Sequence, residues 1–182
     1  PDYMVGCIGG GSNFAGFVFP MIEKKLKGKV DTTFLAVEPS DVPSLTKGEF
    51  RYDYGDAGCI TPMFKMYTLG HDFTPNALHA GGLRYHGMNP LVSELYHNKA
   101  ISAVSYNETQ IFQAAVTFAR TEGIIPAPES SHAIRGAIEL ALDAKKKNEE
   151  KTIIFNLSGH GLLDMVGYGN FLKNCDHPMI DV

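Results

Sequence analysis

Four apolar runs of strand length divide the chain, at residues 3–9, 32–39, 100–105 and 152–159. They are nearly continuous and carry many β-branched residues, which is typical of strands buried on both faces of a sheet. The first run begins two residues into the chain. We therefore expect the sequence to start inside a longer protein.

Two amphipathic segments between these runs predict helices. Phenylalanine, valine, methionine and isoleucine recur at helical spacing near residues 14–27, although Pro20 must kink this helix or mark the start of its regular part. Asn107 is suited to cap a second helix, and Gly123 is suited to end it.

A third helix has the clearest pattern. We expect Ser130 or Ser131 to cap it, and lysines 145–147 lie at the end where the helix dipole favours cations. Its apolar stripe consists of Ala133, Ile134, Ala137, Ile138, Ala141 and Leu142. Strands that alternate with helices indicate a three-layer α/β fold, with a mostly parallel sheet covered by helices. We expect residues 1–182 to form a single domain.

Residues 39–90 interrupt this alternation. More than fifty residues rich in Gly, Pro, Asp, Tyr and His separate the second and third runs, whereas ordinary connections have about 4–6 residues. The segment also holds seven phenylalanines and tyrosines, which is unusual for disorder. They are Phe50, Tyr52, Tyr54, Phe64, Tyr67, Phe73 and Tyr85. A functional connection is therefore the favoured interpretation.

Composition and charge narrow the class of partner. The 182 residues are 44% hydrophobic and carry a formal charge of −4, so neither nucleic acid nor an anionic membrane is favoured as a partner. Cys7, Cys59 and Cys175 have no CxxC spacing, which argues against a disulfide framework and a zinc site. No apolar run approaches the length of a membrane span. These features favour a cytoplasmic protein with a small-molecule ligand.

Three glycines follow the first run and lead into the first helix. Gly9, Gly10 and Gly11 expose backbone amides without interference from Cβ atoms, and Ser12 and Asn13 follow at the helix N-terminus. Such a loop binds a phosphate well, because the amides converge on the anion and the helix dipole attracts it. A tight turn that needs glycine is the simpler alternative, but one or two glycines would serve a turn.

Two classes of phosphate ligand remain open from these residues. Gly9 and Gly11 match the first positions of the dinucleotide fingerprint, Phe14 breaks its third, and Glu38 stands where a ribose-binding acid would lie. This pattern allows an NAD-dependent dehydrogenase. A non-catalytic module that binds phosphorylated small molecules is the other alternative.

Four motifs in order along the chain resemble one family. They are "GGGSN", "AVEP", "EGIIPAPESSHAI" and "NLSGHG", and together they resemble the C-terminal half of tryptophan synthase β chains, which are fold-type-II pyridoxal-phosphate enzymes. The stretch "HAGGLRYHG" is closer to the second, divergent branch of these chains. Arg84 stands where the main branch has an aspartate.

The resemblance implies roles for particular residues. Gly9, Gly10, Gly11, Ser12 and Asn13 would bind the phosphate of pyridoxal phosphate. Glu129 would lie beside the cofactor ring, and Ser158 would form a hydrogen bond with the ring nitrogen without holding it protonated. Without the resemblance, Glu129 and Ser158 also fit a helix entry and a turn.

The resemblance also implies a monovalent-cation site formed by backbone carbonyls around Gly9, Tyr85 and Gly87. No side-chain metal site is expected, since His71, His79, His86, His97, His132 and His177 lack metal-ligand spacing.

A Schiff-base lysine is the missing part. Pyridoxal-phosphate chemistry requires one, and in the resembled family it follows Ser-His in the N-terminal half, a context absent from this sequence. We therefore expect a C-terminal fragment that is inactive by itself and self-associates or dimerises. The parent enzyme would make L-tryptophan from indole and L-serine or phosphoserine. Association with an α-type subunit is left open.

Overall fold

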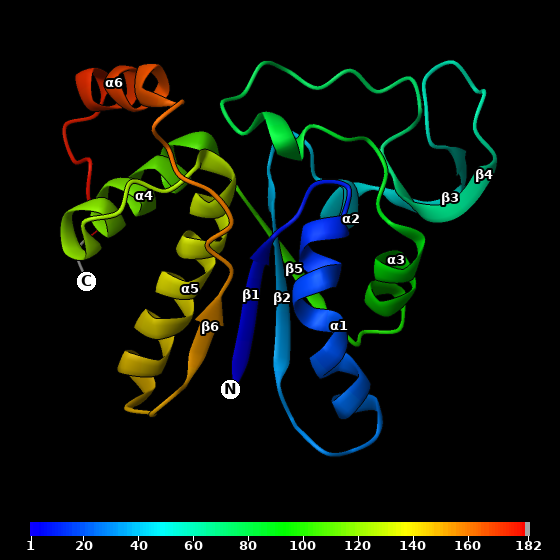
Figure 1. Cartoon of the computed structure of the whole chain (residues 1–182), viewed down its shortest axis with the longest axis horizontal. Coiled ribbons are helices and arrows are strands. Elements are labelled where there is room, and N and C mark those ends of the chain that lie inside the picture. The colour runs from blue at the N-terminus through cyan, green and yellow to red at the C-terminus, as the bar shows by residue number, and fades with distance from the viewer. Residues whose placement is uncertain (181–182) are drawn as a thin grey trace.

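A computed structural model of the chain describes residues 1–180. A four-stranded sheet with the order β5-β2-β1-β6 lies at its centre, and all neighbouring strands in it run parallel (Figure 1). Its strands are β1 (Tyr3–Cys7), β2 (Thr33–Pro39), β5 (Ser102–Tyr106) and β6 (Ile153–Phe155). The four predicted runs therefore all contain strands of one sheet.

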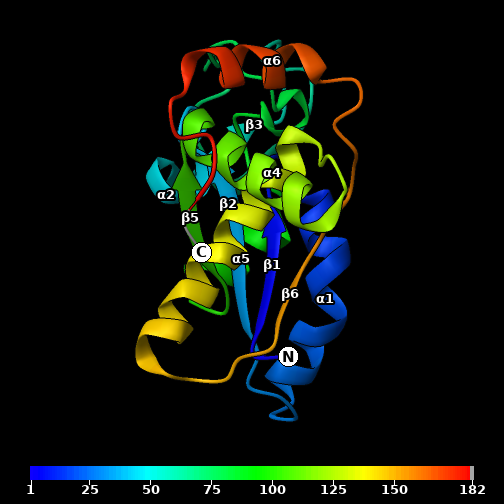
Figure 2. The same cartoon turned by 90° about the vertical axis from the view of Figure 1, so that its left-hand side faces the viewer.

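Helices cover both faces of this sheet. Helices α1 (Ser12–Leu26) and α3 (Pro90–His97) lie on one side, and α4 (Glu108–Glu122) and α5 (Pro128–Lys147) lie on the other (Figure 1). The turned view places α4 and α5 in front of the sheet, with α6 (Met165–Asn174) above them (Figure 2). This arrangement confirms the predicted three-layer α/β fold with a mostly parallel sheet.

Alternating residues of the central strands fill two cores. Met4 and Phe34 pack with α1, whereas Val5 and Val37 pack on the opposite face near α5. Both faces are buried, which explains why the sequence shows near-continuous apolar runs. A Cβ atom on Gly136 of α5 would lie 2.8 Å from Val37 Cγ2, so this glycine lets the helix approach the sheet closely.

The helix ends test the predicted caps. Asn107 caps α4 in a capping box, and Gly123 ends the helix in the left-handed conformation, as predicted. The predicted serine cap of α5 is wrong: the cap residue is Ala127, and Pro128 occupies the first turn. Proline suits that turn because it has no amide hydrogen to satisfy.

Other boundaries also differ from the prediction. Strand β6 ends at Phe155, so only the first part of the predicted run 152–159 is a strand. Pro20 lies inside α1, which continues past it to Leu26. Sequence reasoning did not anticipate α6.

Residues 39–90 contain structure that the sequence reading missed. They form α2 (Ser44–Lys47), the antiparallel hairpin of β3 (Glu49–Tyr54) and β4 (Met63–Thr68), and the short 3-10 helix η1 (Gly81–Leu83). Asp53 is buried in the hairpin, where Thr68 Oγ1 donates to its carboxylate at 2.7 Å. The end of this region returns to the glycine loop.

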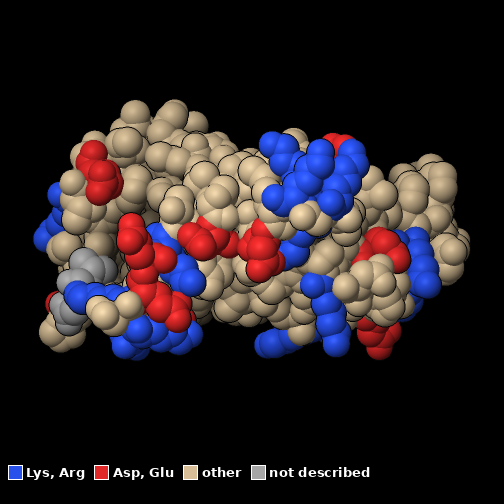
Figure 3. Space-filling view, turned by 90° about the horizontal axis from the view of Figure 1, so that it is seen from below, with Lys and Arg blue, Asp and Glu red and all other residues tan. Residues whose placement is uncertain are grey.

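Surface charge is mixed on the face seen from below. Groups of Lys and Arg lie among Asp and Glu side chains there (Figure 3). None of the described helices is both long and apolar enough to cross a membrane. Cys7, Cys59 and Cys175 are free.

Candidate cofactor site

A cavity of about 440 Å³ lies where β1 and β6 end. The glycine loop forms one wall, η1 forms another, and the start of α5 and the segment after β6 close the rest. The lining residues are Cys7, Ile8, Gly9, Gly10, Gly11, Ser12, Asn13, Phe14, Gly82, Leu83, Ala127, Glu129 and Ser158. The carboxyl end of a parallel sheet is where open α/β folds bind ligands.

The glycine loop packs closely against the segment that follows η1. A Cβ atom on Gly9 would lie 2.7 Å from Leu83 Cα, and one on Gly10 would lie 3.3 Å from Tyr85 Cδ1. Gly11 has a φ of +105°, a conformation that side chains rarely adopt. Packing alone therefore requires glycine at two of the three positions, and Gly10 is the least constrained.

The first turn of α1 is suited to an anion. Its cap residue is Gly11, which offers no side-chain hydrogen bond, and the turn contains no acidic residue. The first amides of a helix have no partner inside it, so those of Ser12 and Asn13 point to the cavity end of the helix. Together with the backbone amides of the glycine loop, these helix amides fit the phosphate of a cofactor.

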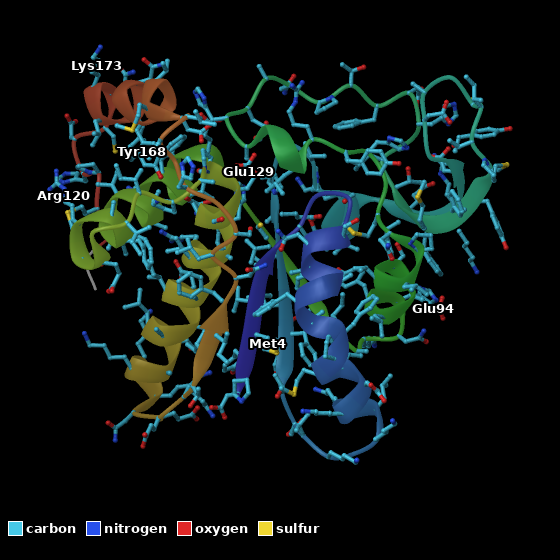
Figure 4. All side chains as sticks on the ribbon, viewed as in Figure 1. Met4, Glu94, Arg120, Glu129, Tyr168 and Lys173 are labelled. Carbon is cyan, nitrogen blue, oxygen red and sulfur yellow. The ribbon has the colours of Figure 1, made fainter. Side chains whose placement is uncertain are left out.

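Glu129 joins two walls of the cavity. Gly82 N donates to its Oε1 at 2.9 Å, which connects the start of α5 to η1. Figure 4 shows Glu129 at the top of α5, beside η1. The carboxylate is therefore held at the cavity by a backbone hydrogen bond as well as by its helix.

Ser158 lies on the segment that follows β6. The residue is exposed and lines the cavity, and its amide donates to Ser130 Oγ at 3.1 Å. Two residues before Ser158, Asn156 Nδ2 donates to Asn13 Oδ1, and this hydrogen bond connects the segment to the glycine loop. The two hydrogen bonds connect three sequence motifs that lie far apart along the chain.

Cys7 adds a thiol to the cavity floor. Burial raises the pKa of the Cys7 thiol to about 11, so it stays neutral at physiological pH. It is a polar but uncharged neighbour for a ligand.

The structure thus brings all seven predicted cofactor-binding residues to one cavity. Of the residues predicted to contribute carbonyls to a cation site, Tyr85 lies beside Gly10 and Gly87 lies against Met66, and neither lines the cavity. The cation site stays a prediction. Cys7, Gly82 and Leu83 were missed, although the paired glycines in "HAGGLRYHG" were a signal that a close contact was needed.

Glu38 does not lie where the dehydrogenase alternative needs it. Its carboxylate is fully buried and accepts hydrogen bonds from Leu45 N and Thr46 N, both at 2.9 Å, at the start of α2. It therefore caps a helix and is not available to a ribose hydroxyl. The NAD-dependent alternative is wrong in this respect, and the comparisons below give it no support.

Comparison with known protein families shows the class to which this fold and cavity belong. The family of pyridoxal-phosphate dependent enzymes matches residues 1–159, so the chain belongs to this family. A solved structure has a similar fold: the processed form of threonine deaminase isoform 2 from Solanum lycopersicum superposes with a TM-score of 0.64 at 17% identity, over 94% of this chain and 43% of that one.

Relatives with higher sequence identity are tryptophan synthase beta chains. The chain is 58% identical to tryptophan synthase beta chain 2 of Aquifex aeolicus over 175 residues, 94% of this chain and 40% of that protein. It is 54% identical to tryptophan synthase beta chain of Pyrococcus horikoshii over 173 residues, 95% of this chain and 38% of that protein. The chain therefore spans about two fifths of the length of these relatives.

Proposed function

We propose that this chain is the phosphate-binding part of a pyridoxal-phosphate-dependent lyase that makes L-tryptophan by β-replacement. The donor would be L-serine or phosphoserine, and the acceptor indole. The cavity carries the proposal, because the glycine loop, Glu129 and Ser158 meet there. The identity of 54–58% with tryptophan synthase beta chains supports the choice of reaction.

Each group of residues has a separate task in this proposal. Backbone amides at 9–13 bind the cofactor phosphate, and the helix dipole of α1 favours its negative charge. Ser158 meets the ring nitrogen with a hydroxyl, which does not hold that nitrogen protonated as a carboxylate would. Glu129 lies at the cavity in contact with Gly82 N.

Pyridoxal phosphate, when bound, withdraws electrons from the amino-acid substrate so that its β-substituent can leave. A hydroxyl beside the ring nitrogen moderates this withdrawal, which suits replacement at the β-carbon. The neutral Cys7 thiol adds no charge on the same side of the cavity. This chain therefore orients and tunes the cofactor.

The Schiff-base lysine is proposed to lie outside this chain. Within the described part of the sequence, no lysine lines the cavity. By itself the 182-residue chain is proposed to be an inactive phosphate-binding module that self-associates. A homodimer of the whole protein, an α-type subunit partner and a cytoplasmic location also belong to the proposal.

The test is turnover by the full-length protein that carries this chain. With pyridoxal phosphate and indole, we expect tryptophan from L-serine or from phosphoserine, measured by chromatography against a blank that contains free cofactor. The Gly10→Val variant serves as a control with a blocked phosphate site. No tryptophan from either donor by a protein that retains its cofactor would rule out the proposed reaction.

A further inference from the structure

The segment 156–160 carries Ser158 but has little structure of its own. Strand β6 ends at Phe155, and residues 157–160 are exposed. Its two ends are fixed by the backbone: Asn156 N donates to Val5 O, and Ala127 N donates to Gly159 O, both at 3.0 Å. The position of Ser158 between these ends depends on what holds its own amide.

Ser130 holds that amide. Its Oγ accepts from Ser158 N at 3.1 Å, and the side chain of Ser130 is 0% exposed in the first turn of α5. A buried hydroxyl is costly unless it forms a hydrogen bond. The Ser130 hydroxyl therefore has a defined place and a defined partner, and the partner is the residue proposed to meet the cofactor ring.

The neighbouring serine has a different task. Ser131 is also 0% exposed, but its Oγ donates to Ala127 O at 2.9 Å, within the same helix turn. Two adjacent buried serines thus serve different ends. Ser131 satisfies its own helix, whereas Ser130 reaches across to the segment beyond β6.

We propose that Ser130 is a positioning residue for the cofactor site, which acts by fixing Ser158. The inference rests on the proposed function, since it assumes that Ser158 meets the ring nitrogen. Fixing the amide fixes the Cα atom and so limits where the Ser158 hydroxyl can lie. A hydrogen bond to a ligand is stronger when its donor is held in place before binding.

The experiment compares Ser130→Ala with Ser131→Ala in the full-length protein. We expect Ser130→Ala to weaken pyridoxal-phosphate binding about three- to tenfold, the free energy of one neutral hydrogen bond expressed as affinity. The absorption spectrum of the bound cofactor should change as well. Ser131→Ala removes an equally buried hydroxyl, so it should lower the melting temperature comparably but leave the affinity and the spectrum unchanged.

A double-mutant cycle tests whether Ser130 acts through Ser158. In a Ser158→Ala background there is no hydroxyl left to position, so adding Ser130→Ala should cause little further loss of affinity. Fully additive losses would overturn the inference, and so would a Ser130→Ala protein with unchanged affinity and spectrum. A full-length protein that binds no pyridoxal phosphate would instead overturn the proposed function itself.

Hydrogen exchange keeps the inference testable if Ser130→Ala does not fold. In the unaltered protein the Ser158 amide should exchange slowly although its residue is exposed, because Ser130 accepts its hydrogen. Exchange as fast as that of an unprotected amide would show that this hydrogen bond is absent, and the inference would fail.

Discussion

Gly10 is the residue at which binding can be separated from packing. A side chain at Gly9 would meet the backbone of Leu83, and Gly11 has a positive φ, so substitutions there disturb the fold. A Cβ atom at Gly10 meets the ring of Tyr85 at 3.3 Å, and this side chain can shift by a few tenths of an ångström.

We therefore predict that Gly10→Val weakens pyridoxal-phosphate binding by the full-length protein more than tenfold. The added side chain crowds Tyr85, so we expect the loop to shift and its amides to lose their alignment on the phosphate. The overpacking should cost about 1–3 kcal/mol of unfolding free energy. Affinity is measured by cofactor titration, and stability by denaturant unfolding.

Gly16→Ala is the matched control for this variant. Gly16 lies in α1 with open space around its Cβ position, so alanine there should stabilise the helix by about 0.5–1 kcal/mol without changing affinity. If Gly10→Val and Gly16→Ala bound the cofactor equally well, the glycine loop would be a turn and not a phosphate site.

Single residues also show what the sequence could reveal about the site. Gly9 to Asn13, Glu129 and Ser158 were predictable because each lies in a recognisable motif. Cys7 had no such motif, and the paired glycines at 81–82 signalled a close contact without showing that η1 packs over the glycine loop. Glu38 misled the dehydrogenase interpretation because a strand-end acid has the same sequence signal whether it binds a ribose or caps α2.

Helix α5 carries a buried histidine that makes the fold sensitive to acid. His132 is buried, and its Nδ1 donates to Pro128 O at 2.9 Å. Burial lowers the pKa of His132 to about 4 from its ordinary value of 6.5. The unfolded chain therefore takes up a proton as the pH falls through 6.5, whereas the folded chain does so only near pH 4.

We predict that stability is lost as the pH falls from about 6.5 to 4 and that His132 contributes about 3 kcal/mol to this loss. His132→Gln should flatten the pH dependence of the unfolding free energy, although it lowers stability at pH 7. His177→Gln, at an exposed histidine, should leave the pH dependence as it is. Equal curves for His132→Gln and the unaltered protein would contradict this explanation.

Elements were predictable where their signals are local. The four strands and the ends of α4 follow from apolar runs, an asparagine cap and a glycine stop. Burial on both faces is confirmed only for the central strands β1 and β2, since the edge strands β5 and β6 are partly exposed. The length of β6 was not predictable, because the residues after Phe155 leave the sheet and form hydrogen bonds with α5 through Ser158 and Gly159. The β3–β4 hairpin was also missed. It buries the carboxylate of Asp53, and the sequence does not show that Thr68 and His71 form hydrogen bonds with this group.

For the molecule as a whole, we expect this chain to supply one side of the cofactor site. It spans about two fifths of the length of its tryptophan synthase relatives. An apolar groove of about 370 Å³ runs beside the edge strand β6 and includes Phe118, Ile138 and Phe155. Exposed apolar surface of this kind supports the expectation that the chain self-associates when it is alone.

We propose that these 182 residues bind the cofactor phosphate but do not provide the lysine that holds the cofactor. Borohydride reduction of the full-length protein, followed by digestion and mass spectrometry, tests it directly, because reduction attaches the cofactor permanently to that lysine. We predict one modified lysine per chain, outside residues 1–182. Modification of any of the lysines in this sequence, or no modified lysine at all, would contradict the account.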